Sequence, residues 1–279
     1  MDVGRIEVQP VVDGRIVGSL PKTKPFPPVA STLWADQGGM FHEADAIEST
    51  LGGFLVHAGD RVVLVDAGAG PAVEERPASL HIEQGSFLAS LAVVGVRPDE
   101  VTDVVFTHLH FDHIGWVSDE QAPIFPNAMV RCASADLDHF LAGPDEEQYV
   151  TTLYGAATAR ARLAPVLDRI ETWHDDTTIC PGIDIRLAPG HTPGSSVVAL
   201  SDGTHRALLL GDLIHCPLEL QDDDFDLLVD HDPVLAQRAR LAYARELEGA
   251  DVVASAAHFP GLRFGRLLPG EVERRWTFT

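Results

Sequence analysis

The chain has 279 residues, 45% of them hydrophobic, which is enough to bury a sizeable core in one large α/β domain or two small ones. Its 20 basic and 42 acidic residues give a formal net charge of −22, and such a surface repels nucleic acids and, more weakly, anionic membranes. No apolar run approaches the roughly 20 residues that span a bilayer. We therefore expect a small-molecule substrate, with no nucleic-acid and no membrane partner.

The N-terminal sequence and the cysteines favour a cytoplasmic protein. MDVGRIEVQPVVDGRIVG has no basic segment followed by an apolar one, so no secretory signal is visible. The three cysteines, Cys132, Cys180 and Cys216, are odd in number and lack the spacing of a zinc knuckle. We expect them to be reduced thiols.

The first half of the chain alternates strand and helix signals. Residues 6–20 predict an N-terminal hairpin turning at Asp13-Gly14, and the proline- and glycine-rich segment 21–46 predicts a long loop or lid. Strands are expected at 49–59, 60–68 and 103–110, a helix at 84–95, and a short helix after Asp112. Residues 1–50 thus form the predicted hairpin and lid.

The second half repeats this organisation loosely. We expect strands at 127–133, 177–180, 183–189, 195–202, 206–212 and 250–258. Helices are expected at 134–143, 149–173 (interrupted near Pro165) and 232–249. This order predicts an α/β fold with two β-sheets packed between helix layers. Because no linker is poor in apolar residues, we expect a single domain over residues 1–279.

Four potential metal ligands lie within FTHLHFDHIGW, residues 106–116. His108 and His110 follow an apolar run at the expected end of a strand, where side chains two apart share a face. Asp112 and His113 lie in the following turn and can point toward the same space. Histidines this close would repel one another on protonation, so the cluster favours a bound cation.

Three later residues follow the same rule, since each comes directly after a predicted buried strand. They are His191, Asp212 and His258. In α/β folds, functional groups collect beyond the carboxyl ends of strands, where loops converge. A histidine in such a place is more often structural when it stands alone, but all three follow the HxHxDH cluster in order.

This set of residues resembles the metallo-β-lactamase superfamily from about Gly52 to His258. The resemblance implies an αβ/βα four-layer sandwich with a two-metal site between its sheets. It also implies that one ion is held by His108, His110 and His191, the other by Asp112, His113 and His258, and that Asp212 bridges them. Asp66 matches a position that supports the site without ligating, although an Asp before Gly68 is equally typical of a plain turn.

Histidine and carboxylate ligands without cysteine suit two divalent ions, most often Zn²⁺, with Mn²⁺, Co²⁺ or Fe²⁺ as alternatives. Seven ligands over two ions leave open positions for water and substrate, which is typical of a catalytic site. We expect a metal-bridging hydroxide to attack an ester-like bond, and catalytic Asp112 to orient it and later carry a proton.

Several short strings resemble the branch with N-acyl homoserine lactonases and methyl parathion hydrolase: THLHFDHIG, FPNA, PGID, GHTPG, GDLI and AAHFPG. This resemblance implies hydrolysis of a hydrophobic neutral lactone or ester, and often a homodimer. An organophosphate triesterase using the same site and a non-catalytic metal-binding protein are the alternatives. Many lactonases of the branch have a tyrosine where this chain has His215, which either donates to the substrate carbonyl in its place or packs beside Cys216 and Pro217.

An apolar substrate cavity needs large side chains near the metals. Trp116 either walls this cavity or belongs to the core, the more frequent place for tryptophan. About three of the remaining candidates are expected to line it. They are Phe26, Trp34, Phe41, Phe140, Tyr149, Tyr154, Leu218 and Phe259.

Overall fold

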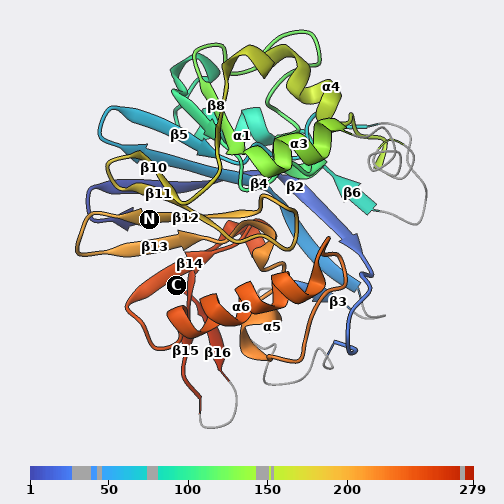
Figure 1. Ribbon diagram of the computed structural model, residues 1–279, viewed down its shortest axis with the longest axis vertical. Helices are drawn as coiled ribbons and strands as arrows, with labels where there is room; N and C mark the ends of the chain where they lie inside the picture. Colours follow the sequence, from blue (N-terminus) through green and yellow to red (C-terminus); the bar gives the residue numbers. More distant parts are fainter. Residues whose placement is uncertain (27–38, 43–45, 74–80, 143–150, 152–153, 271–273) are drawn as a thin grey trace.

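The computed structural model describes residues 1–26, 39–42, 46–73, 81–142, 151, 154–270 and 274–279. Two mixed β-sheets pack face to face, and helices cover their outer faces (Figure 1). This arrangement confirms the predicted four-layer α/β sandwich. Within the described residues, none of the helices combines the length and the hydrophobicity that crossing a lipid bilayer requires.

The first sheet comes from the N-terminal half. Among the described residues its strand order is β1-β2-β4-β5-β7-β8-β9, with β3 paired to β4 and β6 to β2. Strands β5, β7, β8 and β9 run parallel, and the other pairs are antiparallel. The strands are β1 (Asp2–Val3), β2 (Ile6–Gly18), β3 (Phe41–His42), β4 (Ala46–Ala58), β5 (Arg61–Val65), β6 (His81–Glu83), β7 (Asp103–Val105), β8 (Met129–Ala133) and β9 (Ile170–Trp173).

The second sheet follows the chain order from β10 to β16. Only β13 and β14 pair in parallel among its described strands, and helix α6 connects them. The strands are β10 (Thr177–Cys180), β11 (Ile183–Leu187), β12 (Ser196–Ser201), β13 (Arg206–Leu209), β14 (Val252–Ser255), β15 (Gly265–Leu268) and β16 (Arg275–Phe278). The last two were not predicted.

Helices α1, α3 and α4 cover the first sheet, and α5 and α6 cover the second (Figure 1). The α-helices are α1 (Phe87–Val93), α2 (Phe111–Ile114), α3 (Ser134–Ala142), α4 (Ala159–Leu163), α5 (Leu218–Gln221) and α6 (Pro233–Leu247). Short 3₁₀ helices are η2 (Pro98–Glu100), η4 (Ala164–Arg169), η5 (Gly211–Leu213) and η6 (Pro260–Leu262). Asp232 caps α6 by accepting a hydrogen bond from the Leu235 backbone.

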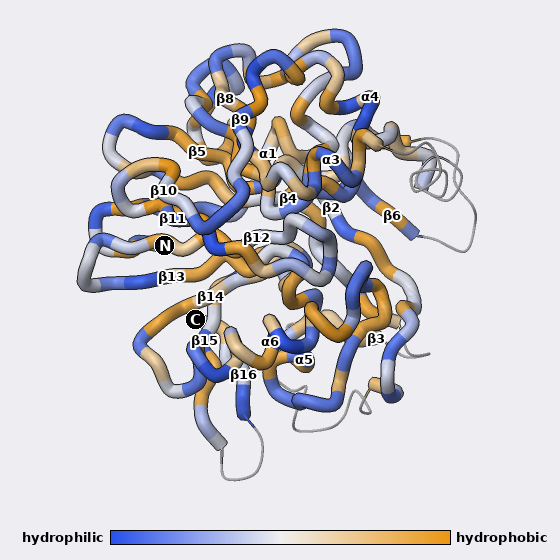
Figure 2. The backbone as a smooth tube through the Cα atoms, in the orientation of Figure 1, coloured by the Kyte–Doolittle hydropathy of each residue, from blue (hydrophilic) through white to orange (hydrophobic). Residues whose placement is uncertain are grey.

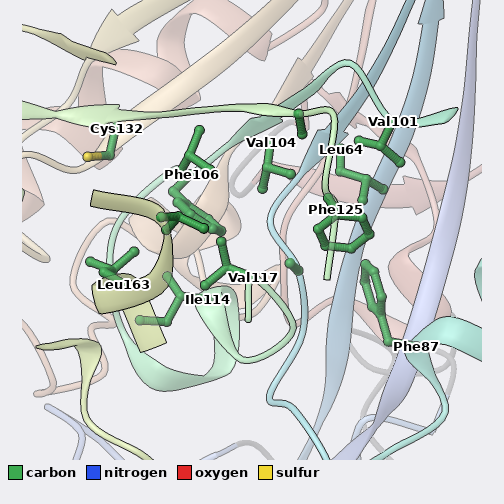
Figure 3. Close-up of a cluster of buried hydrophobic side chains, with 14 of the residues drawn as sticks. Leu64, Phe87, Val101, Val104, Phe106, Ile114, Val117, Phe125, Cys132 and Leu163 are labelled. Atoms are coloured by element: carbon green, nitrogen blue, oxygen red, sulfur yellow. The ribbon is translucent and has the colours of Figure 1, made fainter. Parts of the chain in front are cut away.

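Strand β5 shows how the layers are stabilised. Its residues alternate between the two faces of the sheet, and both faces are buried. Val63 and Val65 join the cluster between the two sheets, whereas Leu64 joins the cluster beneath the helices of the first sheet (Figure 3). Hydrophobic residues accordingly concentrate along the strands (Figure 2). A separate cluster, which includes Leu208 and Leu247, lies between the second sheet and α6.

The predicted hairpin over residues 6–20 is wrong, because β2 is one continuous strand paired along its length with β4. Asp13 lies beside a bulge in this strand and is fully buried. Its carboxylate accepts hydrogen bonds from the backbone N–H groups of Ala69, Gly85 and Phe87. The polar residue that signals a turn in the sequence therefore satisfies buried amides instead. The predicted lid over 21–46 lies partly outside the described residues.

The predicted long helix over 149–173 is also wrong. Within the described residues, α4 begins after Thr158, whose side chain caps it, and the chain then forms η4 and strand β9. Pro165 stands at the start of η4, where it cannot continue the hydrogen bonding of an α-helix. Strand β7 ends at Val105, earlier than predicted, so residues 106–110 leave the sheet. That early exit frees the HxHxDH segment to reach the second sheet.

Candidate metal centre

The structure brings all seven predicted ligands together. They form two groups, and in each group the ligand atoms lie within 4.8 Å of one another. The first group is His108, His110, His191 and Asp212, and the second is Asp112, His113 and His258. This division matches the one expected from the sequence, and no cysteine belongs to either group.

Each ligand stands just beyond a strand or at the start of a helix. His108 and His110 lie in the loop after β7, and Asp112 and His113 lie on α2. The other ligands come from the second sheet, after β11, β13 and β14: His191, Asp212 and His258. The centre therefore lies where the ends of the two sheets meet, and its assembly depends on their packing.

Three imidazole nitrogens face one another in the first group. His110 Nδ1 is 2.9 Å from His108 Nε2 and 3.0 Å from His191 Nε2. Burial, together with the neighbouring histidines, lowers the pKa of all three imidazoles, so they are neutral at pH 7. A neutral imidazole has only one N–H, so these three nitrogens cannot all be satisfied by hydrogen bonds to one another. Their lone pairs can instead bind a cation placed between them.

Asp212 lies between the two groups. Its Oδ2 is 3.6 Å from His191 Nε2, and its Oδ1 is 3.2 Å from His113 Nε2. Oδ2 is also 3.0 Å from His258 Nε2. The Asp212 carboxylate is therefore within reach of the histidines of both groups.

Two buried polar atoms of the described ligands, one from each group, lack a hydrogen-bond partner. In the described structure, His113 Nε2 and Asp212 Oδ1 are buried without a hydrogen bond. Burial disfavours charged imidazoles, but the Asp212 carboxylate outweighs it and raises the pKa of His113 and His258. Asp112 completes the group, with Oδ2 3.6 Å from His258 Nε2. The donor set of nitrogens and carboxylate oxygens fits two divalent cations.

Polar contacts on the far side of the ring orient His113, His108 and His258. Asp66 accepts from His113 Nδ1 at 3.0 Å, which is the supporting position predicted for it. Thr107 Oγ1 lies 3.2 Å from His108 Nδ1 and donates to the same Asp66 carboxylate. The Thr50 carbonyl accepts from His258 Nδ1 at 3.0 Å.

Asp230 supports His191 in the same way, and sequence reasoning missed it. Its Oδ1 is 3.2 Å from His191 Nδ1, and its side chain is 1% exposed. The residue lies in the acidic stretch before α6, where other aspartates are exposed. Only its position after three apolar residues, in LLVD, hints that it is buried.

His215 lies beside the ligands. Its Nε2 is 3.5 Å from Asp212 Oδ2, and its Nδ1 is 3.5 Å from Glu219 Oε2. Burial opposes its protonation, but the Glu219 carboxylate beside Nδ1 and the carboxylates of Asp212 and Asp230 raise its pKa to about 9. Glu219, four residues further on, is fully buried and was also missed.

A cavity of about 320 Å³ opens onto the centre. It is lined by Ile16, Leu20, Ser49, His110, Phe111, Asp112, Tyr154, His191, Asp212, His215, Val229 and His258. The Phe111 and Tyr154 rings stack with centroids 4.5 Å apart. Neither lysine nor arginine is present among these described lining residues, so the cavity suits a neutral substrate.

Most of the predicted cavity residues lie elsewhere. Trp116 packs against the core beneath the first sheet, and Phe259 is fully buried against Trp276. Leu218 is buried in a cluster that also packs against Phe26. None of these four candidates lines the cavity, because large apolar side chains gain most from complete burial.

Tyr154 does line the cavity, as was expected of about three of the named candidates. Phe41 and Phe140 are buried and do not line it. Trp34 and Tyr149 lie outside the described residues. Of the residues proposed from the sequence for the substrate site, His215 and Tyr154 line the cavity. The aliphatic side chains that also line it, those of Ile16, Leu20 and Val229, were not predicted.

Comparisons with known proteins agree with this fold. Residues 53–256 match the family model described as the metallo-beta-lactamase superfamily. A probable metallo-hydrolase of Mycobacterium tuberculosis is 24% identical over 238 residues, which are 75% of this chain and 74% of that protein.

Two solved structures extend the comparison. A probable metal-dependent hydrolase from Staphylococcus aureus has a TM-score of 0.79 at 18% identity and covers 100% of this chain and 99% of its own. The second structure is AidC, a dizinc quorum-quenching lactonase in complex with the product N-hexanoyl-L-homoserine. Its TM-score is 0.76 at 22% identity, and the match covers 99% of this chain and 95% of that chain. At these identities the likeness shows a shared fold.

Proposed function

The chain belongs to the metallo-β-lactamase superfamily, and from this premise we propose that it is a dinuclear-metal hydrolase of lactones or esters. The observation that carries the proposal is the position of Asp212 between two complete ligand groups, beside a cavity with an apolar wall. Zn²⁺ suits the nitrogen and oxygen donors best, with Mn²⁺, Co²⁺ and Fe²⁺ as alternatives. Such ions, when bound, lower the pKa of water and polarise a carbonyl.

Asp112 is the residue proposed to handle the proton of the attacking water. Its side chain is 15% exposed and lines the cavity, whereas the histidines of the same group are more deeply buried. One of its oxygens faces His258, so the carboxylate has a fixed direction. A carboxylate held at the cavity wall can orient a water molecule and accept its proton as the carbon–oxygen bond forms.

His215 is proposed to assist the substrate oxygen. Glu219 accepts the backbone N–H of His215 and lies 3.5 Å from Nδ1 of its ring, and Nε2 lies near Asp212 at the cavity. A donor in that position can hydrogen-bond the substrate carbonyl and then protonate the leaving alkoxide. This is the role that the tyrosine of related lactonases would have, carried out here by an imidazole.

The cavity supports a neutral substrate with an apolar portion. Ile16, Leu20 and Val229 give it an aliphatic wall, and Phe111 and Tyr154 give it an aromatic one. Its volume of about 320 Å³ lies at the small end of the range for ligand pockets. The resemblance to AidC, whose structure holds N-hexanoyl-L-homoserine, supports an acyl lactone as the substrate class.

A hydrolysis panel on metal-replete protein tests the proposal. The panel contains acyl homoserine lactones of graded chain length, aryl esters and phosphotriesters. We expect the lactones to be opened fastest, and Asp112→Asn to keep its fold but lose turnover. Faster turnover of phosphotriesters than lactones would assign the organophosphate triesterase function instead. Purified protein without any transition metal and without turnover would overturn the proposal and favour a non-catalytic protein.

A further inference from the structure

A buried arginine on α6 connects to both sides of the metal centre. Arg240 is 2% exposed and lies among three carboxylates, those of Glu219, Asp226 and Asp230. Its Nη1 donates to Asp230 Oδ2 at 2.9 Å, and its Nη2 is 2.7 Å from Asp226 Oδ1. Burying a guanidinium is costly unless it is paired, so Arg240 needs carboxylate partners at this position.

Asp230 links the arginine to a predicted metal ligand. One of its oxygens bonds Arg240, and the other bonds His191 Nδ1 at 3.2 Å. The carboxylate is therefore held at both ends, and it fixes the ring of His191 with Nε2 directed at His110. Such a contact to the far side of a ligating imidazole sets its orientation and its tautomer.

Glu219 links the same region to His215. Its Oε2 accepts the backbone N–H of His215 at 2.7 Å and lies 3.5 Å from Nδ1 of that ring. Its Oε1 accepts the backbone N–H of Leu227 at 3.2 Å. The carboxylate thus joins the segment carrying His215 to the segment that precedes Asp230, and its charge faces Arg240.

The backbone keeps α6 against the His191 loop. Asp232 N donates to the Gly190 carbonyl at 2.8 Å, and His231 N donates to the His191 carbonyl at 3.1 Å. Gly190 has a φ of 145°, and a Cβ at this position would lie 2.3 Å from the backbone nitrogen of Ala236. The glycine allows this close approach, so the position of α6 is coupled to that of the ligand loop.

We propose that Arg240, Asp230 and Glu219 are positioning residues, with Arg240 orienting two carboxylates that separately hold His191 for metal binding and His215 for the substrate. The inference rests on the proposed function, since it assigns these residues to that metal centre. The three residues should differ in their effects. Loss of Asp230 should lower metal affinity, loss of Glu219 should lower turnover, and loss of Arg240 should lower both.

The Asp230 part is tested by competition with a chromophoric chelator for Zn²⁺, using the full chain. We expect Asp230→Ala to lower the metal affinity of the first group about 10- to 100-fold. Asp226→Ala is the matched control. Asp226 forms an ion pair with Arg240 and accepts a hydrogen bond from Gln237, but it contacts none of the predicted metal ligands in these interactions. Its metal affinity should equal that of the wild type. Equal losses in the two variants, or no loss in Asp230→Ala, would overturn the assignment.

The Glu219 part is tested by the split between metal binding and turnover. Glu219→Gln should bind metal normally and keep the absorption spectrum of the Co²⁺-substituted protein, while kcat falls about tenfold or more at little change in KM. Asp230→Ala should change that spectrum, because the ring of His191 is no longer held. A normal kcat in Glu219→Gln, or a changed Co²⁺ spectrum in it, would contradict the role given to Glu219.

Arg240→Met should combine both losses, and Arg240→Lys should recover part of each. If Arg240→Met does not fold, the single carboxylate variants still decide the proposal. The metal-affinity measurements need no substrate, so they stand even if lactones prove not to be hydrolysed. A wild-type protein that binds no metal would instead overturn the proposed function and this inference with it.

Discussion

The imidazole of His113 donates from Nδ1 to Oδ2 of Asp66 at 3.0 Å, which directs its Nε2 toward Asp212. Asp66 stands at the end of β5 with a φ of 62°, in the left-handed region that non-glycine residues seldom adopt. Its other oxygen accepts the backbone N–H of Thr107. The strained backbone is therefore held by contacts with the ligand segment.

Asp66→Asn should weaken metal binding at the second group specifically. The amide cannot serve both Thr107 and His113 as an acceptor, so the ring loses its fixed orientation. We expect the affinity of the group containing Asp112, His113 and His258 to fall about 10- to 100-fold, with the first group less affected. A two-step metal titration measures this. Equal weakening of both steps would contradict a local role.

Asp212→Ala should remove metal from both groups. Its carboxylate lies beside His191 in one group and His113 in the other, so the loss leaves each group one ligand short. Elemental analysis of the purified variant should give less than half the metal content of the wild type. Asp251→Ala, an exposed aspartate paired with Arg266, is the control and should keep its metal. Wild-type metal content in Asp212→Ala would exclude a bridging position.

The ligands could be predicted because each carries two independent signals. Asp212 and His258 each follow an apolar run that forms a largely buried strand, His191 follows strand β11, and each of the three is a residue type that binds metal. Buried strands are the most readable elements of this sequence. The sequence, together with the resemblance it carries, therefore predicted the sandwich and the residues that gather at the candidate metal centre without any knowledge of distances.

The supporting residues carry only one signal. Asp230 and Glu219 lie in an acidic stretch, and apart from the apolar residues before Asp230 the sequence does not separate them from exposed neighbours such as Asp224. Their burial depends on Arg240, which is on another element, and long-range pairing of this kind has no local pattern. The hairpin predicted at Asp13 was wrong for a similar reason. A buried aspartate that accepts hydrogen bonds from three backbone N–H groups cannot be told from a turn residue in the sequence.

Metal affinity of the second group should rise with pH. In the metal-free protein, burial opposes protonation of His113 and His258, but the Asp212 carboxylate raises the pKa of both above the usual value, so protons occupy the nitrogens that would bind metal. A cation must displace these protons, and each one adds up to about a tenfold gain in affinity per pH unit. Calorimetry in buffers of different ionisation enthalpy should detect proton release. Binding without proton release would contradict this.

Asp136 should make stability fall as the pH rises. The residue is fully buried on α3, and burial raises its pKa to about 6 despite hydrogen bonds from Thr192 and Gly194. Because the folded state then binds this proton more tightly than the unfolded chain does, the contribution is present below about pH 4 and is lost by about pH 6. Its size is on the order of 2–3 kcal/mol.

Denaturant unfolding of metal-free Asp136→Asn and wild type measures that contribution. The stability of the wild type relative to the variant should decrease between about pH 4 and pH 6 and then level off. Asp138→Asn, on the exposed side of the same helix, is the matched control and should show no such trend. A difference that grows with pH would reverse the sign and contradict the assignment.

Val229→Phe should shift the preference toward short acyl chains. Val229 lines the aliphatic wall of the cavity with Ile16 and Leu20, and a larger side chain there takes up space within a volume of about 320 Å³. We expect KM for long-chain lactones to rise roughly tenfold, with little change for the shortest chain. Val93→Phe, at a position 86% exposed on α1, is the control. Equal effects on all chain lengths would mean that the acyl group does not contact this wall.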